Sequence, residues 1–160
     1  MRDGRIGLAP LGAVLSFLHR EEPPANEQIV ARAGRYAADW TFQDLSALRR
    51  WYLRRLPTTM RARAALAIGK RLVLATVKQS RVKTKFNGTT AGIDISSALF
   101  DQLRDPATIP MRGFYGSAID RLLALCAVDA EVIVTSDQPG AWSLAITVRG
   151  ARPLEVTDAA

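Results

Sequence analysis

The sequence has few of the residues that metal sites and disulfides require. It contains one cysteine, Cys126, and one histidine, His19. One cysteine excludes an intrachain disulfide and an all-cysteine zinc site, and one histidine excludes motifs that bind a metal through two histidines. We therefore expect no bound metal and no metal-dependent hydrolysis.

The motifs of common enzymes are also missing. No serine lies in the Gly-x-Ser-x-Gly turn of serine hydrolases, and a serine triad would have to use His19 as its base. The segment Ile68-Gly69-Lys70 lacks the earlier glycine and the following hydroxyl of a phosphate-binding loop. Cys126 falls in the middle of an apolar helical arc, which indicates a buried structural cysteine and not a nucleophile. These gaps favour a protein without catalytic activity.

Acidic residues are missing from the middle of the chain. Between Arg49 and Lys85 there are twelve Lys and Arg residues and no Asp or Glu, and the net charge of the whole chain is +7. The remaining residues include ten basic and fifteen acidic side chains. We therefore expect the positive charge to form one face of the molecule, which favours an anionic partner.

Length and composition indicate one globular domain. The chain has 160 residues, of which 48% are hydrophobic and 23% are charged. An apolar stretch over residues 6–18 follows two arginines, but it has no signal-peptide cleavage site and is too short to span a bilayer. We expect a short helix and a Pro-Pro break over residues 1–25, the domain over 26–149, a flexible tail over 150–160, and a cytoplasmic location.

Helical spacing of apolar residues predicts three helices in the first half of the chain. The first covers residues 26–40, and its expected core-facing arc consists of Ile29, Ala33, Tyr36, Ala37 and Trp40. The segment 41–44 has the form of a capping box, which would start a second helix that ends before Pro57 and whose apolar arc includes Leu48 and Tyr52. The third covers residues 58–79 and carries an exposed basic stripe formed by Arg63, Lys70, Arg71 and Lys78.

The second half of the chain predicts strands. Basic and apolar residues alternate from Arg81 to Phe86, Asn87-Gly88 is a strong hairpin turn, and a returning strand follows. After a loop over 106–110 we expect a helix over 114–127 and strands over 131–135 and 142–148. This order predicts an α+β fold, in which a helical N-terminal half packs on a four-stranded antiparallel sheet formed by two hairpins separated by a helix.

The basic stripe has three interpretations. Its side chains could contact nucleic-acid phosphates, although no helix-turn-helix, RNP or KH signature accompanies them. With apolar neighbours, the same side chains could attach the protein peripherally to an anionic membrane. The third interpretation is a solvated face whose charge keeps the protein in solution. An acidic protein partner and a homodimer are further open alternatives. Of all these partners, nucleic acid is the one that the sequence favours least.

Several segments of the second half follow a family pattern. They are the loop Pro110-Met-Arg-Gly-Phe-Tyr-Gly116, the helix that follows it, and the strands near 83–95, 130–135 and 142–148. Over about residues 26–149 the chain resembles the 4-vinyl reductase domain family, typified by bacteriochlorophyll 4-vinyl reductase-like proteins and related in fold to TRAPP transport-particle subunits and haem-nitric-oxide-binding domains. The resemblance implies a pocket between sheet and helices for a hydrophobic small molecule, such as a tetrapyrrole or a lipid, and an accessory role in bacteriochlorophyll biosynthesis and photosynthesis.

Six residues are expected to line that pocket: Phe114, Tyr115, Ile119, Leu123, Trp142 and Leu144. The cysteines that relatives carry in the last hairpin and before the Phe-Tyr-Gly segment are missing here, so no cysteine-borne metal or redox role carries over. No nicotinamide or flavin site is visible, so we expect ligand binding without turnover, with a vinyl reductase as the enzymatic alternative. The alternative function is docking on an acidic protein, a membrane surface or nucleic acid through the basic stripe.

Overall fold

The fold is α+β, as the sequence predicts. The computed structural model describes residues 23–76, 80–97, 108–138 and 141–152. The helices are α2 (Pro23–Gln43), α3 (Ala47–Arg55), α4 (Thr58–Thr76) and α6 (Thr108–Leu125). The strands are β1 (Ser80–Asn87), β2 (Thr90–Ser97), β3 (Val128–Gln138) and β4 (Ala141–Ala151).

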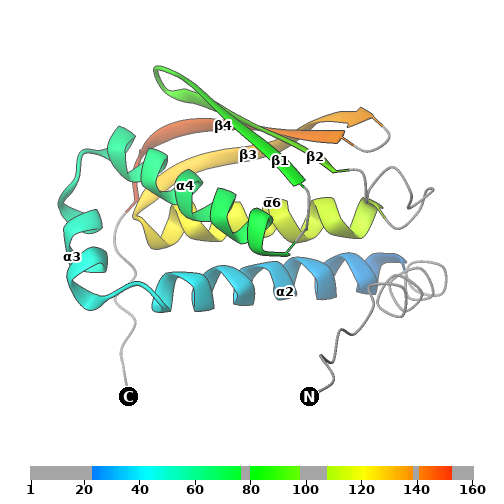
Figure 1. Ribbon diagram of the computed structural model, residues 1–160, viewed down its shortest axis with the longest axis horizontal. Coiled ribbons are helices and arrows are strands. Elements are labelled where there is room, and N and C mark those ends of the chain that lie inside the picture. Colours follow the sequence, from blue (N-terminus) through cyan, green and yellow to red (C-terminus); the bar gives the residue numbers. More distant parts are fainter. Residues whose placement is uncertain (1–22, 77–79, 98–107, 139–140, 153–160) are drawn as a thin grey trace, which may run out of the picture.

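The four strands form one antiparallel sheet in the order β1-β2-β4-β3. The β1–β2 hairpin closes where Asn87 pairs with Thr90, and Gly88 has a φ of 60°, a left-handed conformation that glycine adopts without steric cost. Helix α6 connects this hairpin to the β3–β4 hairpin (Figure 1). The predicted pair of hairpins separated by a helix is therefore confirmed.

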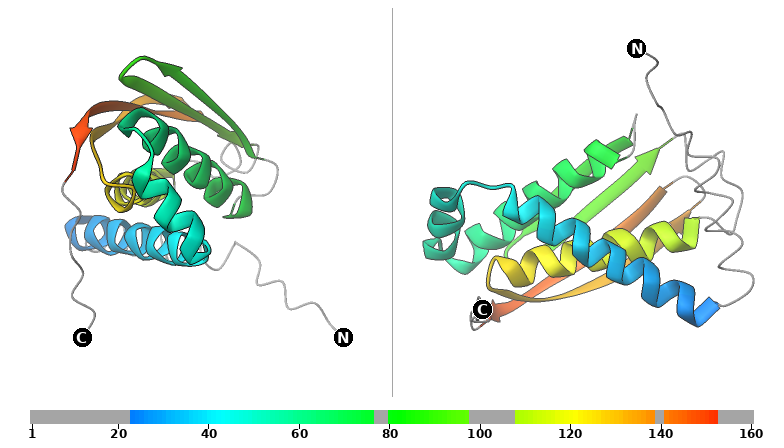
Figure 2. Two further views of the ribbon diagram at one scale, coloured as in Figure 1. Left: turned by 90° about the vertical axis from the view of Figure 1, so that its left-hand side faces the viewer. Right: turned by 90° about the horizontal axis from the view of Figure 1, so that it is seen from below.

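The elements form three layers. One face of the sheet is covered by α4 and α6, and α2 packs on the side of α6 that points away from the sheet (Figures 1 and 2). Helix α3 lies at one end of the molecule, where it links α2 to α4. Of the helices that the structure describes, none covers the outer face of the sheet.

A hydrophobic core fills the space between the sheet and its two helices. Strands β2 and β4 alternate as expected, so that their inward residues are buried. Full burial of an aliphatic or aromatic side chain stabilises the fold by roughly 1.5–3 kcal/mol. The largest fully buried side chains are Leu66, Val73, Ile93, Ile95, Tyr115, Ile119, Leu122, Leu123, Leu144 and Ile146.

The prediction for the buried face of α2 is wrong. Ile29, Tyr36 and Trp40 are exposed, and the buried face carries Val30, Gly34, Ala38 and Phe42 instead. A Cβ atom on Gly34 would overlap the backbone carbonyl of Phe114, so the close approach of α2 to α6 requires glycine at this position. Gly34 and Ala38 allow the close contact, and Ile29, Tyr36 and Trp40 lie on the outer face of the helix.

The first half also differs from prediction at a helix boundary. Helix α2 continues through Thr41, whose Oγ1 donates a hydrogen bond to the carbonyl oxygen of Ala37 at 2.7 Å, so this threonine caps no new helix. Ser46 is the N-cap of α3, and its hydroxyl oxygen accepts from the backbone N–H of Arg49 at 3.4 Å. The predicted capping box at 41–44 is therefore wrong, because the N-cap lies five residues later.

Several other boundaries move outward, but helix α6 ends at Leu125, two residues before the predicted end. Helix α6 begins at Thr108 and contains Pro110 in its first turn, where a missing backbone N–H costs no helical hydrogen bond. Strands β3 and β4 are longer than predicted, and β4 includes the first two residues of the expected tail. Helix α2 begins at Pro23, inside the Pro-Pro break that was expected to end the segment 1–25. The short helix expected before that break, the end of the third helix over 77–79 and the tail beyond residue 152 lie outside the described residues.

Candidate functional site

Helix α3 displays its side chains instead of burying them. It is nine residues long, with the sequence Ala-Leu-Arg-Arg-Trp-Tyr-Leu-Arg-Arg, and contains no buried residue. Its hydroxyl N-cap and the two arginines in its last turn favour a helix here, because they satisfy a free N–H and complement the negative end of the helix dipole. The helix is thus held by local interactions and by few tertiary contacts.

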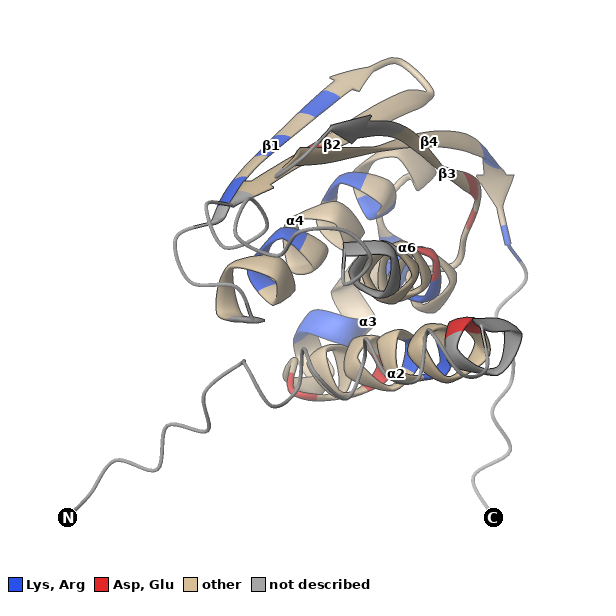
Figure 3. Cartoon of the chain, turned by 90° about the vertical axis from the view of Figure 1, so that its right-hand side faces the viewer, with Lys and Arg blue, Asp and Glu red and all other residues tan. Residues whose placement is uncertain are grey.

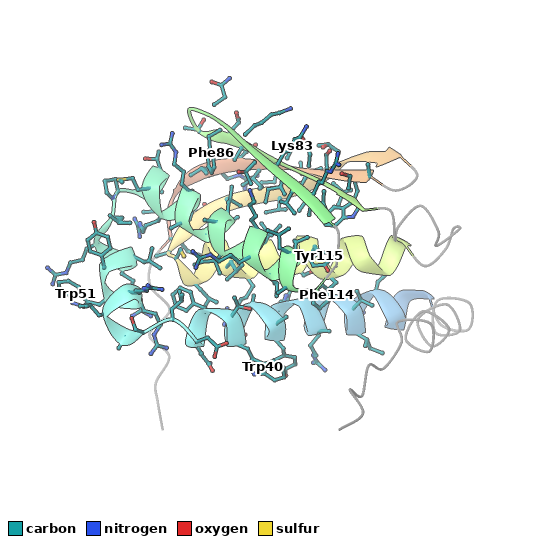
Figure 4. The ribbon with its side chains drawn as sticks, viewed as in Figure 1. Trp40, Trp51, Lys83, Phe86, Phe114 and Tyr115 are labelled. Carbon is teal, nitrogen blue, oxygen red and sulfur yellow. The ribbon has the colours of Figure 1, made fainter. Side chains whose placement is uncertain are left out.

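Three large apolar side chains of α3 lie at the surface, whereas Leu53 packs against the core. The exposed fractions are 74% for Leu48, 53% for Trp51 and 59% for Tyr52. Figure 4 shows Trp51 directed away from the body of the molecule. Contiguous exposed apolar surface bordered by polar residues marks sites of interaction with proteins, membranes or ligands. The predicted burial of Leu48 and Tyr52 is therefore wrong.

The charged residues of α3 are all positive. The helix carries Arg49, Arg50, Arg54 and Arg55, and no Asp or Glu occurs between Leu45 and Ile93. Among the described residues, no carboxylate forms an ion pair with any of these four arginines. Figure 3 shows basic residues on α3, α4 and β1. The sequence-level expectation of a positive face is met at this end of the molecule.

A cation–π contact orders part of this surface. The guanidinium carbon of Arg55 lies 4.3 Å from the centroid of the Trp51 ring. Such a pair presents a positive charge and a flat apolar ring together. On α4, the guanidinium of Arg63 lies 5.3 Å from the Phe86 ring centroid, so this member of the predicted stripe faces the first hairpin.

A mostly apolar groove runs between α3 and α4. Its volume is about 460 Å³. Arg49 from α3 and Arg71 from α4 contribute its charged groups, and every other lining residue is apolar or aromatic. The lining residues are Leu45, Leu48, Arg49, Trp51, Tyr52, Leu53, Ala64, Ala67, Ile68 and Arg71.

A second hollow lies on another side of α3. It has a volume of about 590 Å³ and extends to α6 through Leu125. Its charged lining residues are Arg50, Arg54 and Arg55, and Trp51 lines both hollows. We call the exposed side chains of α3 together with the groove the α3 surface.

The predicted basic stripe on α4 is only partly described. Arg63 and Arg71 are exposed, Lys70 is half-buried, and Lys78 lies outside the described residues. Sequence reasoning included the arginines of α3 in the basic segment but did not choose them as site residues, because an apolar arc at helical spacing was expected to be buried. The signal that could have found them is the position of Trp51 and Tyr52 between two pairs of arginines in a short helix.

The six residues predicted to line a ligand pocket lie together in the core. Tyr115, Ile119, Leu123, Trp142 and Leu144 are buried, and Phe114 is half-buried against them. The Tyr115 ring stacks on the Trp142 ring with 5.4 Å between the ring centroids. The Phe114 ring meets the Tyr115 ring edge-on, with 5.0 Å between their centroids. The groove and the hollow beside α3 are lined by other residues. The pocket residues are therefore neighbours, and a ligand among them stays a prediction.

Two buried side-chain groups have no hydrogen-bond partner among the described residues, Arg61 Nε and Trp142 Nε1, and the second of them lies in the core. The Nε1 atom of Trp142 is buried, and no acceptor among the described residues receives its hydrogen. A buried donor without a partner costs about 1–3 kcal/mol. A polar atom of a bound molecule would remove this cost.

Cys126 is buried, as expected for a structural cysteine. Burial raises the pKa of its thiol from 9.0 to about 11, while the charges of Arg61 and Arg54 act in the opposite direction without offsetting it. At neutral pH the group is therefore a thiol, which is a poor nucleophile. Within the described part of the chain, no three His, Cys, Asp or Glu side chains are grouped as a metal site requires.

None of the helices in the described segments is long and apolar enough to cross a bilayer.

Comparisons with known proteins give little further information. No protein-family model matches the chain, and no curated protein matches it. Among solved structures, the chain is similar to a trafficking protein particle complex subunit 3 from Naegleria fowleri, in a crystal structure described as covalently bound to palmitic acid. The match has 11% sequence identity and a TM-score of 0.49, and covers 92% of this chain and 86% of that chain.

Proposed function

We propose that the protein is a non-catalytic module that docks on an anionic membrane surface through the α3 surface. One observation carries this proposal: a helix without buried residues displays Leu48, Trp51 and Tyr52 among four arginines, in a segment without any carboxylate. A solvated charged face would explain the arginines. It would not explain why three large apolar side chains are exposed on the most basic helix.

The two kinds of side chain would contribute in different ways. Basic side chains near an anionic leaflet contribute about 1 kcal/mol each, and arginine keeps its charge at all physiological pH values. Trp and Tyr favour the level of the lipid headgroups, and a buried apolar side chain such as Leu48 adds hydrophobic energy. Helix α3 would therefore lie in the membrane interface, with its arginines at the phosphates.

The apolar component favours a membrane over the other anionic partners. Nucleic acid would contact the arginines and could stack on Trp51, but it offers Leu48 and the walls of the groove no apolar surface. An acidic protein would need apolar residues of its own at the same place. Both partners are outcomes of the test described next.

Cosedimentation with vesicles tests the proposal. We expect binding to vesicles of equimolar phosphatidylcholine and phosphatidylserine, and none to phosphatidylcholine alone. The double substitution Arg54→Gln and Arg55→Gln should weaken binding at least about tenfold, because two charges are lost. The matched control is Arg32→Gln with Arg35→Gln, which removes two exposed arginines from α2.

Three results would contradict membrane docking through α3. They are equal binding to both kinds of vesicle, equal loss in the two double variants, and tighter binding of a nucleic acid or an acidic peptide that the vesicles cannot displace.

Binding of a hydrophobic ligand is a second candidate function. The unpaired Nε1 of Trp142, next to the Tyr115 ring, favours it, because a ligand with a hydrogen-bond acceptor would satisfy this donor. Membership of the 4-vinyl reductase domain family, with a tetrapyrrole or lipid as ligand and a role in bacteriochlorophyll biosynthesis, belongs to this candidate. The side chains that would surround the ligand belong to the hydrophobic core.

Mass spectrometry of the purified protein under native conditions tests this candidate. A retained pigment or lipid, lost in Trp142→Phe but not in Trp40→Phe, would support it. A protein that carries nothing, and whose melting temperature and tryptophan fluorescence do not change on titration with a tetrapyrrole or a fatty acid, would contradict it.

A further inference from the structure

We infer that the groove between α3 and α4 holds the acyl chain of a single anionic lipid, with Arg49 and Arg71 binding its headgroup. The inference rests on the proposed membrane docking and goes further, because it assigns a binding site for one molecule to a surface that could otherwise act through charge alone.

The walls of the groove suit a hydrocarbon chain. Leu48, Leu53 and Ile68 supply aliphatic surface, and Trp51 and Tyr52 supply flat aromatic surface. The groove volume of about 460 Å³ lies within the range of roughly 300–1,000 Å³ that small-molecule sites occupy. A chain seated here would cover apolar side chains that are now exposed to water.

The polar groups of the groove select the chemistry of the headgroup. Its two charged groups are the guanidinium groups of Arg49 and Arg71, one from each helix. No Asp or Glu lies in either helix or in the segment between them. Guanidinium groups bind carboxylates and phosphates through paired hydrogen bonds. An anionic headgroup therefore fits, and a cationic one is repelled.

The same lining disfavours a peptide as the occupant. A bound peptide would bring backbone N–H and C=O groups to the groove, where the side-chain hydrogen-bonding groups are limited to two arginines, one indole and one phenol. Buried backbone groups without partners cost free energy, whereas a hydrocarbon chain has none to satisfy. The arginines and the indole donate only, so the Tyr52 hydroxyl is the one side-chain acceptor that the groove offers to peptide N–H groups.

Titration with monomeric laurate tests the inference without a bilayer. We use laurate below its micelle concentration as the probe and dodecylammonium, with a chain of the same length, as the cationic control. Saturable one-to-one binding of laurate by calorimetry is expected, and none of dodecylammonium. Laurate brominated on its chain should quench fluorescence in the full chain and lose this effect in Trp51→Phe.

Substitutions on α4 locate the bound chain. Ala67 lines the groove and Ala75 does not, and both are exposed on α4. Ala67→Phe fills the groove and should abolish laurate binding, whereas Ala75→Phe should leave it unchanged. Arg49→Gln with Arg71→Gln should weaken binding at least about tenfold, as expected for the loss of hydrogen bonds to a charged group.

The outcomes separate this inference from the proposed function. Vesicle binding without laurate binding would overturn the groove as a lipid site and leave membrane docking intact. Loss of laurate binding in Ala75→Phe, or its survival in Ala67→Phe, would also overturn the groove assignment. A protein that binds neither vesicles nor laurate would contradict both proposals.

Discussion

Gly34 decides which face of α2 is buried. Its missing side chain allows the helix to approach the backbone at Phe114, and Ala38 and Phe42 follow on the same face. Arg121 of α6 reinforces this contact through a hydrogen bond from Nε to Asp39 Oδ1 at 2.9 Å. The sequence pattern favoured the opposite face, because it counts apolar side chains and cannot weigh how closely two backbones can meet.

Two neighbouring aromatic residues on α2 should therefore differ in their contribution to stability. Phe42 is 4% exposed and Trp40 is 68% exposed. Phe42→Ala should lower the free energy of unfolding by about 3–5 kcal/mol, whereas Trp40→Ala should change it by less than about 0.5 kcal/mol. Urea denaturation of the two variants measures this. Equal losses would show that the face of α2 has been assigned incorrectly.

Burial of the Cys126 thiol predicts that the protein loses stability at high pH. Its pKa is raised on folding, so the neutral thiol favours the folded state, and this contribution is complete below pH 9 and is lost as the pH rises towards 11. The loss should amount to at most about 3 kcal/mol. Denaturation of the wild type and of Cys126→Ala across this range isolates it. Parallel stability curves for the two proteins would contradict the burial of the thiol.

In helix α3, the burial predicted from the spacing of apolar residues differs from the burial that the structure shows. Its apolar spacing is that of an ordinary core-facing helix, yet it contains no buried residue. Local periodicity predicts that a helix forms, but it cannot indicate whether another element covers the apolar face. The β1–β2 hairpin shows the opposite case, because alternation and an Asn-Gly turn fix both its register and its inward side.

Because α3 has few tertiary contacts, it should open more readily than the helices of the core. Its backbone amides should exchange with deuterium at a lower opening free energy than those of α6. Ser46→Ala removes the N-cap and should lower the stability of α3 by about 1 kcal/mol, with no effect on α6. Amide exchange measured by NMR checks this. Equal protection of α3 and α6 would mean that α3 is packed more firmly than its exposure indicates.

At the scale of the whole molecule, charge is separated between two regions. The described acidic residues lie on α2 or just after its end, on α6 and on the sheet. None lies on α3 or α4. On the sheet some of them are paired, as in Lys85 with Asp94 and Arg149 with Glu131. This separation would orient the molecule with its α3 end towards an anionic surface.

This orientation predicts a steep response to salt. Screening by added salt weakens attraction between exposed charges, so vesicle binding should fall strongly as ionic strength rises. The apolar side chains of α3 should preserve a residual affinity at high salt in the wild type, and this should disappear in Leu48→Ser with Trp51→Ser. Binding that does not respond to salt would contradict an electrostatic contribution.

The most direct test of docking through α3 is the fluorescence emission of Trp51 on binding to vesicles of equimolar phosphatidylcholine and phosphatidylserine. The measurement uses Trp40→Phe, so that the two remaining tryptophans are the exposed Trp51 and the buried Trp142. Docking through α3 predicts that the emission shifts to shorter wavelength and is quenched by lipids brominated on their acyl chains. Unchanged emission and no quenching, in protein that cosediments with the vesicles, would contradict it.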